Sequence, residues 1–516
     1  MKKLVWLGLV ITAVFLAGSC SPTETPVRAA ATTYYVATDG DNNNPGTLAE
    51  PWGTIQYAAD NIAAGDTVLV RGGIYEEAVT INISGTAADG DVTFMSYTGE
   101  TAVLDGSNLT VPNSDSALFL IDSQSYVTID GFELRNYRTT NSSRVPMGLY
   151  VAGSAHHITL QNNTIHQIET NAGANGNAHG IAVYGTEAAP AITDVIISNN
   201  ELYDLKLGNS EALVLNGNVA NFLIEGNLVH DNDNIGIDLI GFEGTAPDTA
   251  VDQARDGVVR GNTVYNIDTL NNPAYGGEQS AAGIYVDGGT RITIEQNQVY
   301  QSNFGIEIAS EHSGRATSEI IVRNNLLYHN HNAGLAMGGY DTNRGSTEAC
   351  AILNNTFFEN DSNQTGSGEL YVQFDTQNNV IKNNIFYANA QNLFMSNEYT
   401  QNSGNVLDSN LFFAADGAAV GEWQWKNVYY QGFTAYQTGT GNDANSLFAN
   451  PLLASTSLPD LHLLTNSPAI DAGENLAESG SVDFAGGGRV NNGRIDIGAY
   501  EFLALTESLF LPLAQK

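Results

Sequence analysis

Cysteine, basic residues and long helix-forming runs are all scarce in this chain. The first two scarcities exclude whole classes of protein, and the third points away from a mainly helical fold. Only Cys20 and Cys350 occur among 516 residues, so a disulfide framework is excluded. The 19 Lys and Arg face 56 Asp and Glu, which gives a net charge of −37. A basic groove for nucleic acid is therefore excluded. A polyanionic ligand would be repelled unless bound cations bridged it. The 53 glycines favour short strands joined by tight turns.

The N-terminus reads as a targeting segment. Met1–Lys3 is basic, and the apolar run Leu4–Leu16 is too short to span a bilayer comfortably. The following Leu16-Ala-Gly-Ser-Cys20 resembles a bacterial lipoprotein cleavage box, which implies that Cys20 carries the lipid. We therefore predict a signal peptide over 1–20 and a tether over 21–31.

This interpretation places the mature protein outside the cytoplasm, lipid-anchored at a bacterial cell surface, with full secretion as the alternative. Membrane contact would occur only through the N-terminal lipid. The remaining Cys350 falls on an inward position of the repeat described next, so we expect a buried apolar side chain rather than a nucleophile.

One unit recurs along the chain and predicts the fold. It reads Gly-apolar-x-apolar-x, a loop, then apolar-x-apolar-x-x-Asn, as in Gly180-Ile-Ala-Val leading to Asn200 and Gly283-Ile-Tyr-Val leading to Asn297. Alternation with period two makes each run a strand with one buried face. A single coil cannot bury that face alone, so the coils must stack. We expect the recurrent Asn to form an internal amide ladder.

The segments at both ends of this repeat region resemble the end segments of a known class of protein. The segment Tyr34 to Tyr75, with Pro51-Trp-Gly-Thr-Ile-Gln56, is similar to the entry of exported pectin-lyase-like β-helix proteins. The segment Ser467-Pro-Ala-Ile-Asp471 to Phe502 is similar to a terminal module of such proteins. The resemblance implies a helix near Ile55–Ala64 plugging the first coil, and cap roles for Asp471, Asp496 and Glu501.

We therefore predict an all-β, right-handed parallel β-helix of about ten or more coils, with an N-terminal cap and a C-terminal capping module. The β-helix with its cap would cover 32–415, and the capping module 416–516. We expect a monomer.

The register of the repeat selects candidate site residues. Two x positions in each Gly-apolar-x-apolar-x run point away from the core. Among them Asp238, Asp287 and Glu307 fall on three successive coils, with Tyr285 between two of them. We take these three acids as the candidate catalytic residues.

Long loops follow the same strands. The segments 241–257, 309–319 and 338–349 leave one edge of a single strand column, and 268–282 is a further insertion. Long loops on a rigid scaffold commonly carry function. We therefore expect them to wall a groove over the acids. The candidate substrate-binding residues are Glu243, Arg255, Tyr275, Tyr285, Glu311, His312, Arg315, Tyr340, Asp341 and Arg344.

This pattern favours a glycoside hydrolase acting on a polysaccharide or oligosaccharide. On ideal strand spacings Asp238 and Glu307 would lie roughly 9.6 Å apart at the backbone, and Asp287 and Glu307 about 8 Å apart. Inverting glycosidases hold their acid and base roughly 6.5–9.5 Å apart. Such an enzyme requires no cofactor.

Two alternatives stay open. The run Asp231-Asn-Asp-Asn-Ile-Gly-Ile-Asp238 resembles a calcium-binding strand of some β-helix pectate lyases. That resemblance implies a Ca²⁺-dependent polysaccharide lyase, with Asp238 and Asp287 as metal ligands. Those enzymes need a Lys or Arg base, yet no Lys lies between Lys206 and Lys382. The second alternative is a non-enzymatic adhesin or glycan-binding protein.

Overall fold

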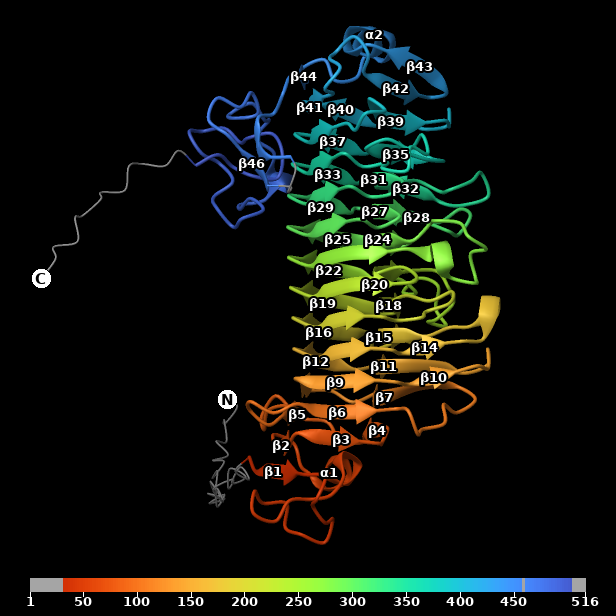
Figure 1. The fold of residues 1–516 in the computed structure, drawn as a ribbon, viewed down its shortest axis with the longest axis vertical. Helices are drawn as coiled ribbons and strands as arrows, with labels where there is room; N and C mark the ends of the chain where they lie inside the picture. Colours follow the sequence, from red (N-terminus) through yellow and green to blue (C-terminus); the bar gives the residue numbers. More distant parts are fainter. Residues whose placement is uncertain (1–30, 457–459, 504–516) are drawn as a thin grey trace, which may run out of the picture.

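The computed structural model describes residues 31–456 and 460–503. The predicted signal peptide, the predicted lipidation site Cys20 and nearly all of the predicted tether lie outside these residues. The described chain winds into a long stack of coils, each coil placing one strand in each of three parallel sheets (Figure 1). The prediction of a right-handed parallel β-helix is confirmed. Among the described residues, no helix is both long and apolar enough to span a membrane.

We call the sheet that begins most coils sheet 1. Its thirteen strands all pair in parallel except the last two, which form an antiparallel hairpin. They are β4 (Val79–Ile81), β7 (Asp115–Asp122), β11 (Val145–Ala152), β15 (His179–Gly185), β18 (Leu213–Gly217), β21 (Ile237–Ile240), β24 (Ala282–Asp287), β27 (Phe304–Ala309), β31 (Ala333–Met337), β35 (Leu370–Val372), β39 (Leu393–Asn397), β42 (Glu422–Trp425) and β43 (Val428–Gln431).

Sheet 2 follows sheet 1 within each coil and has sixteen strands. Its main column is β1 (Thr33–Val36), β2 (Thr67–Val70), β5 (Val92–Ser96), β8 (Val127–Asp130), β12 (His156–Gln161), β16 (Ile192–Ser198), β19 (Val219–Glu225), β22 (Arg255–Arg260), β25 (Thr290–Glu295), β29 (Ile321–Arg323), β33 (Ala351–Leu353), β37 (Val380–Lys382) and β40 (Val406–Asp408). Three short side strands extend it: β28 (Ala316–Ser318), β32 (Ser346–Glu348) and β36 (Thr376–Gln377).

Sheet 3 closes each coil with a third strand. Its members are β3 (Gly73–Tyr75), β6 (Ala102–Asp105), β9 (Phe132–Arg135), β13 (Thr164–His166), β17 (Glu201–Tyr203), β20 (Leu228–Asn232), β23 (Thr263–Ile267), β26 (Gln298–Tyr300), β30 (Leu326–Tyr328), β34 (Thr356–Phe358), β38 (Ile385–Tyr387), β41 (Leu411–Phe413) and β44 (Leu447–Phe448). Outside the three sheets lie two strand pairs, β10 (Arg138–Thr139) with β14 (Glu169–Thr170) and β45 (Leu453–Ser455) with β46 (Asp460–Leu463).

The core is a continuous apolar column inside the stack. Inward Ile, Val and Leu side chains of successive coils are almost fully buried, and Cys350 lies among them, 1% exposed. The expected buried position of Cys350 is confirmed, and burial raises the pKa of its thiol to about 12. A thiol with this pKa is not a nucleophile at neutral pH.

The predicted amide ladder is confirmed. At the turn between sheets 2 and 3, each Asn donates from Nδ2 to Oδ1 of the next, over 2.9–3.2 Å. The ladder is Asn163, Asn200, Asn227, Asn262, Asn297, Asn325, Asn355, Asn384 and Asn410. At this turn the backbone leaves the sheets, so the buried amide groups cannot pair as they do between strands. The ladder bonds give them partners.

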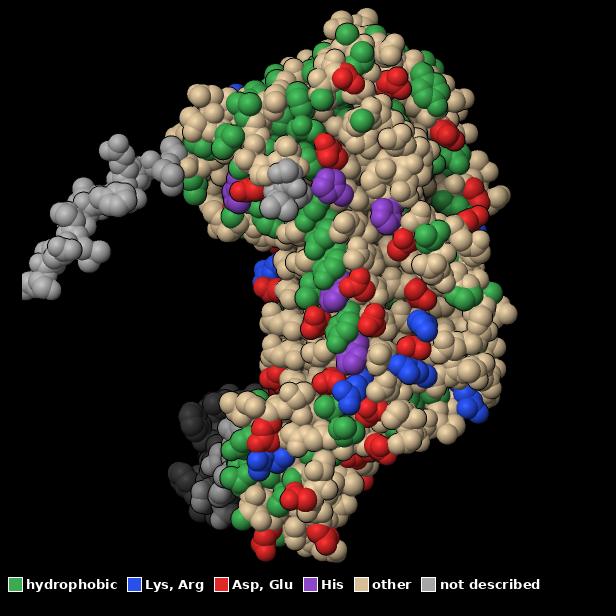
Figure 2. Space-filling view, in the orientation of Figure 1, with side chains coloured by type: hydrophobic (Ala, Val, Ile, Leu, Met, Phe, Trp, Pro, Cys, Tyr) green, Lys and Arg blue, Asp and Glu red, His purple; other side chains and the backbone are tan. Residues whose placement is uncertain are grey.

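The outer face of sheet 3 carries a second, aromatic ladder. Six rings stack with centroids 4.8–5.3 Å apart: His166, Tyr203, His230, Tyr265, Tyr300 and Tyr328. Figure 2 shows histidine and hydrophobic side chains alternating along the middle of this face. Stacking of this kind follows from the regular spacing of successive coils.

Both ends are capped. The short helix α1 (Ile55–Asn61) lies at the first coil, where the family resemblance implies one, and the Thr54 side chain caps it by accepting from the Tyr57 amide. At the other end α2 (Phe433–Thr440) packs over Trp423. Strands β42 and β44 carry the stack past residue 415, the predicted boundary of the capping module.

The last described segment, 460–503, folds back beside the stack (Figure 1). There an apolar cluster joins Tyr328, Phe358 and Ile385 of sheet 3 to Ile497 and Tyr500. The described residues also contain three short 3₁₀ turns, η1 (Gly173–Asn175), η2 (Thr269–Asn271) and η3 (Ala477–Ser479).

Candidate functional site

A groove of about 440 Å³ lies over the outer face of sheet 1. It spans strands β7 to β24 and is covered by the loops that follow β21 and β27. Its polar lining consists of Asp115, Asn177, His179, Tyr184, Asn209, Ser210, Glu211, Asn216, Asp238, Glu243, Tyr275, Tyr285, Asp287 and Glu311. Six of these residues are carboxylic acids, and none is Lys or Arg.

The floor of the groove follows from strand register. Val214, Asp238, Tyr285 and Glu307 are Cα partners on four successive strands, so their side chains leave the same face of sheet 1. This is the column expected from the repeat. The groove ends before Glu307, which lies one strand beyond Tyr285 and is absent from the lining.

The three candidate acids are more enclosed than an outward position implies. Asp238 is 2%, Asp287 5% and Glu307 8% exposed. The loop residues Glu243, Tyr275 and Glu311 line the groove together with Asp238 and Asp287. Alternation places a side chain outside the core but does not say what covers it.

Two loops are fixed above the floor by hydrogen bonds to carboxylates. In the loop after β21, buried Asp252 accepts from the amides of Gly244 and Ala246 at 2.7 and 2.8 Å. In the loop after β27, the Glu311 amide donates to Asp287 Oδ1 at 2.7 Å. These bonds hold Glu243 and Glu311 at the groove, where both were predicted.

The crowded acids resist ionisation. Burial first, then the charges of Glu211 and Asp287, raise the pKa of Asp238 well above its usual range. Burial also raises the pKa of Asp287 well above its usual range, and brings the pKa of Glu211 and of Glu307 to about 8. Neighbouring carboxyls of this kind share protons, so some remain protonated at neutral pH. The Oδ1 atom of Asp238 has no hydrogen-bond partner.

A cluster of three further residues was missed from the sequence. Tyr184 OH lies 2.9 Å from His179 Nε2, and His179 Nδ1 lies 3.1 Å from the Glu211 carbonyl oxygen. A carbonyl only accepts, so Nδ1 carries the proton and Nε2 accepts from the tyrosine. Burial lowers the pKa of His179 to about 4, which keeps the ring neutral.

A backbone irregularity explains why His179 was missed. The amides of Gly180 and Ile181 both donate to the Ala212 carbonyl, at 3.0 and 2.9 Å. Two residues opposite one make a β-bulge, and the bulge reverses the alternation that precedes it. The side chain of His179 therefore faces the groove although simple alternation places it inward.

Several predicted binding residues lie outside the groove lining. Arg255 donates to Asn218 Oδ1 and to the carbonyls of Val251 and Gln253, so it secures the loop after β21. The Arg315 guanidinium lies over the Phe242 ring at 4.9 Å.

The loop after β31 binds both itself and the loop after β27, because Arg344 donates from Nη1 to the Glu311 carbonyl at 3.3 Å. Arg344 lies 4.3 Å from the Tyr340 ring centroid and 3.9 Å from Asp341. The prediction that these arginines, Tyr340 and Asp341 contact substrate in the groove therefore has no support from its lining. Tyr275 and Tyr285 do line it.

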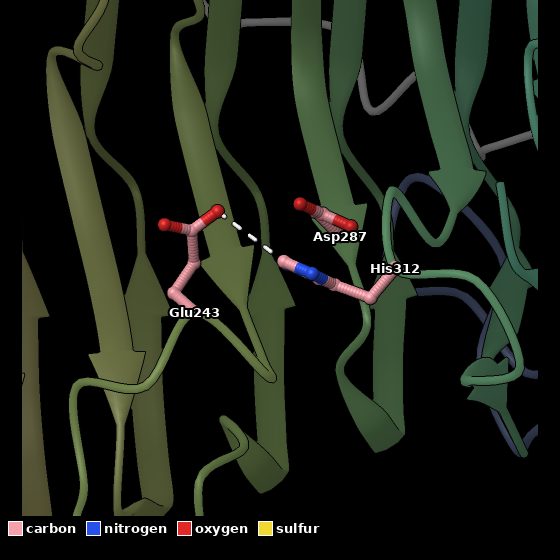
Figure 3. A group of neighbouring side chains, drawn as sticks. All are labelled: Glu243, Asp287 and His312. Atoms are coloured by element: carbon pink, nitrogen blue, oxygen red, sulfur yellow. Dashed lines mark ion pairs between the residues drawn. The ribbon is translucent and has the colours of Figure 1, made fainter. Parts of the chain in front are cut away.

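One group has the composition of a metal site. Single ligand atoms of Glu243, Asp287 and His312 all lie within 4.8 Å of one another, and His312 Nε2 is 3.5 Å from Glu243 Oε1. Figure 3 shows the three side chains converging from two loops and the end of a strand. Asp238, the other metal ligand predicted for the lyase alternative, is not in this group.

The run 231–238 resembles a calcium-binding strand in sequence, but its acidic side chains are not arranged around one position. Asp231 and Asp233 line a separate cavity of about 730 Å³, together with Asp204 and Asp268. Asp238 lines the sheet 1 groove instead. The acids of this run therefore do not converge on one ion.

Comparisons with known proteins agree with the fold. Residues 34–205 match the family model described as Pel9A-like, right handed beta helix region, and residues 250–435 match the model described as right handed beta helix region. The solved structure of XylC in complex with xylose superposes with a TM-score of 0.51 at 13% identity, covering 91% of this chain and 98% of that one.

Two relatives are similar in sequence. The uncharacterized protein YwoF of Bacillus subtilis strain 168 is 40% identical over 466 residues, which cover 90% of this chain and 98% of YwoF. Pectate lyase PEL9 of Emericella nidulans is 33% identical over 144 residues, which cover 25% of this chain and 33% of the lyase. The chain is thus a right-handed parallel β-helix protein of the pectin-lyase-like superfamily and belongs to the same family as YwoF.

Proposed function

We propose that this protein is a carbohydrate-active enzyme that hydrolyses a neutral or weakly charged polysaccharide or oligosaccharide in the sheet 1 groove. A sugar-processing role is supported by the similarity to a protein named pectate lyase and by the shape and lining of the groove. The six lining carboxylates would repel a uronate chain, which favours a substrate of low charge.

The observation that carries the proposal is the environment of Asp238. Its carboxyl is buried, has an unpartnered oxygen, and lies within electrostatic reach of Glu211 and Asp287. A carboxyl that keeps its proton at neutral pH can protonate the leaving oxygen of a glycosidic bond. Asp238 is therefore the proposed general acid.

The base is proposed to be one of the two neighbouring acids, Glu211 or Asp287. Asp287 lies two residues along the adjacent strand from the partner of Asp238. Ideal strand spacings then put the two backbones about 8 Å apart. Carboxyls roughly 6.5–9.5 Å apart leave room for a water and invert the anomeric configuration. Tyr275 and Tyr285 supply ring faces on which a sugar can stack.

A test on a panel of neutral and uronate glycans separates the candidate functions. We expect new reducing ends without the ultraviolet absorbance of an unsaturated product, and an inverted anomer by proton NMR. Asp238→Asn should lower turnover about 10²- to 10⁴-fold. The control Glu225→Gln, an acid of β19 paired with Arg260 on the surface, should leave turnover unchanged. Binding without cleavage would contradict the proposal and favour an adhesin.

A polysaccharide lyase is the second candidate, favoured by the match of residues 34–205 to the Pel9A-like model and by the similarity to a pectate lyase. A lyase would release unsaturated product from a uronate glycan, and a chelator would abolish the reaction. Its weakness is that the lining of the groove holds no Lys or Arg to act as the base.

A further inference from the structure

We propose that Glu243, Asp287 and His312 bind one divalent transition-metal ion at the mouth of the groove. The three residues come from three consecutive coils. Glu243 lies in the loop after β21, Asp287 ends β24, and His312 lies in the loop after β27. Their ligand atoms are already within 4.8 Å of one another (Figure 3).

The donor set indicates the class of metal. One imidazole nitrogen and two carboxylates are typical ligands of zinc and similar ions, whereas Ca²⁺ and Mg²⁺ prefer oxygen ligands alone. Ligands about 2.0–2.2 Å from a tetrahedral ion lie roughly 3.4 Å from each other. The 3.5 Å between His312 Nε2 and Glu243 Oε1 fits this spacing. A small rotation of the half-exposed Glu243 side chain would bring all three ligand atoms to this spacing.

Two further observations point to a cation. The Nε2 atom of His312 is buried and makes no hydrogen bond, and its ion-pair contact with Glu243 Oε1 is 3.5 Å long. In the adjoining floor, Oδ1 of Asp238 also has no hydrogen-bond partner. Asp238 as a whole is only 2% exposed. A buried polar atom without a partner costs free energy, which a bound ion or its water would offset. The groove lining also gathers six acids with no Lys or Arg.

The backbone already orients one ligand. The Glu311 amide donates to Asp287 Oδ1 at 2.7 Å, and this amide belongs to the residue before His312. A hydrogen bond of this kind fixes a ligating carboxylate and strengthens binding. The same contact holds the His312 loop against the end of β24.

The ion would have a structural consequence and a chemical one. It would join the loop after β21 to the loop after β27 across the groove. It would also occupy Asp287, leaving Glu211 as the carboxyl partner of Asp238. This second consequence alone rests on the proposed function.

Metal binding can be measured without any substrate. Protein treated with chelator and then dialysed is titrated with Zn²⁺, Mn²⁺ or Ca²⁺ by calorimetry, and its melting temperature is followed in parallel. We expect one Zn²⁺ or Mn²⁺ per chain with a rise in melting temperature. Binding should weaken at least about 10-fold in His312→Gln and Glu243→Gln. Glu243 is exposed, so its variant tests the site without risk to folding.

A matched control is His329→Gln. His329 lies 3.5 Å from Glu359, the same separation as His312 from Glu243, but on another face of the stack. The His329→Gln protein should bind metal with the affinity of the wild type. Absence of Zn²⁺ and Mn²⁺ binding, preference for Ca²⁺, or affinity unaffected by His312→Gln would each overturn the proposal. The metal titration contains no glycan, so its result does not depend on enzymatic activity. A protein that binds metal but cleaves no glycan would refute only the proposed function.

Discussion

At the residue scale, the strongest structural demand falls on the Asn ladder. Asn262 donates to the Ile224 carbonyl and to Asn297, and its Oδ1 accepts from both the amide and the side chain of Asn227. All of these groups are buried, so no water replaces a lost partner.

Asn262→Ala should therefore lower the free energy of unfolding by about 3 kcal/mol or more, because several buried groups lose partners at about 1–3 kcal/mol each. Denaturant titration measures this loss. Asn82→Ala, which removes one exposed bond to Asp60, should change the free energy by about 0.5 kcal/mol at most. Equal effects of the two variants would refute the ladder's structural role.

The pKa of Glu211 gives a prediction with a definite sign. Burial raises this pKa from 4.5 to about 8, so the folded state holds the proton after the unfolded chain has lost it. The resulting stability is complete below about pH 4.5 and is lost as the pH rises to about 8. Glu211→Gln has no such loss. Its free energy of unfolding should fall less between these pH values than that of the wild type, and parallel curves would contradict the assignment.

The residues of the site differ in how far the sequence predicted them. Asp238 and Asp287 follow from period-two alternation in regular strands, which is a local property. His179 depends on the bulge at Gly180, which exists because two amides share the Ala212 carbonyl of the next coil. That contact joins residues 32 positions apart along the chain, so alternation within the strand alone does not reveal it.

At the element scale, the loop after β21 depends on one carboxylate. Fully buried Asp252 holds the amides of Gly244 and Ala246, and so fixes the neighbouring Glu243. Arg255 secures the other end of the same loop. Lengths and charges in the sequence indicated a functional loop here, but not the bonds that give it one conformation.

Asp252→Ala should release this loop while leaving the stack intact. We expect faster hydrogen exchange and protease cleavage within 241–254, with a melting temperature close to that of the wild type. Asp248→Ala changes an exposed acid of the same loop, which bonds only the Ala250 amide through its side chain, and should behave like the wild type. Loop protection unchanged in Asp252→Ala would show that Asp252 is not the anchor.

At the scale of the whole molecule, the C-terminal segment covers apolar surface on sheet 3. Its cluster includes Ile497 and Tyr500 against Phe358 and Ile385, and the segment bonds the stack through Arg323 Nη1 to the Glu478 carbonyl at 2.8 Å. Inside it Arg489, 1% exposed, lies 3.4 Å from Glu501. Removal of one partner from a buried ion pair commonly costs about 3–5 kcal/mol.

Arg489→Met should therefore detach this segment before the β-helix unfolds. Calorimetry should show a separate transition at lower temperature, together with increased binding of a hydrophobic dye as sheet 3 becomes exposed. Arg494→Met, at an exposed arginine of the same segment, should keep one transition at the wild-type temperature. A single unshifted transition in Arg489→Met would mean that the segment does not depend on this pair.

The sequence by itself determined the coil, the apolar interior, the Asn ladder and the outward column containing Asp238, Tyr285 and Glu307. Each of these follows from alternation and repetition, which act between near neighbours and identical positions of adjacent coils. Only the tertiary structure decided which outward acids are covered, that Glu211 joins Asp238, and that Glu243 and His312 meet over Asp287. Those contacts link loops of unlike sequence from different coils, and their geometry is fixed by packing and hydrogen bonds that no local pattern encodes.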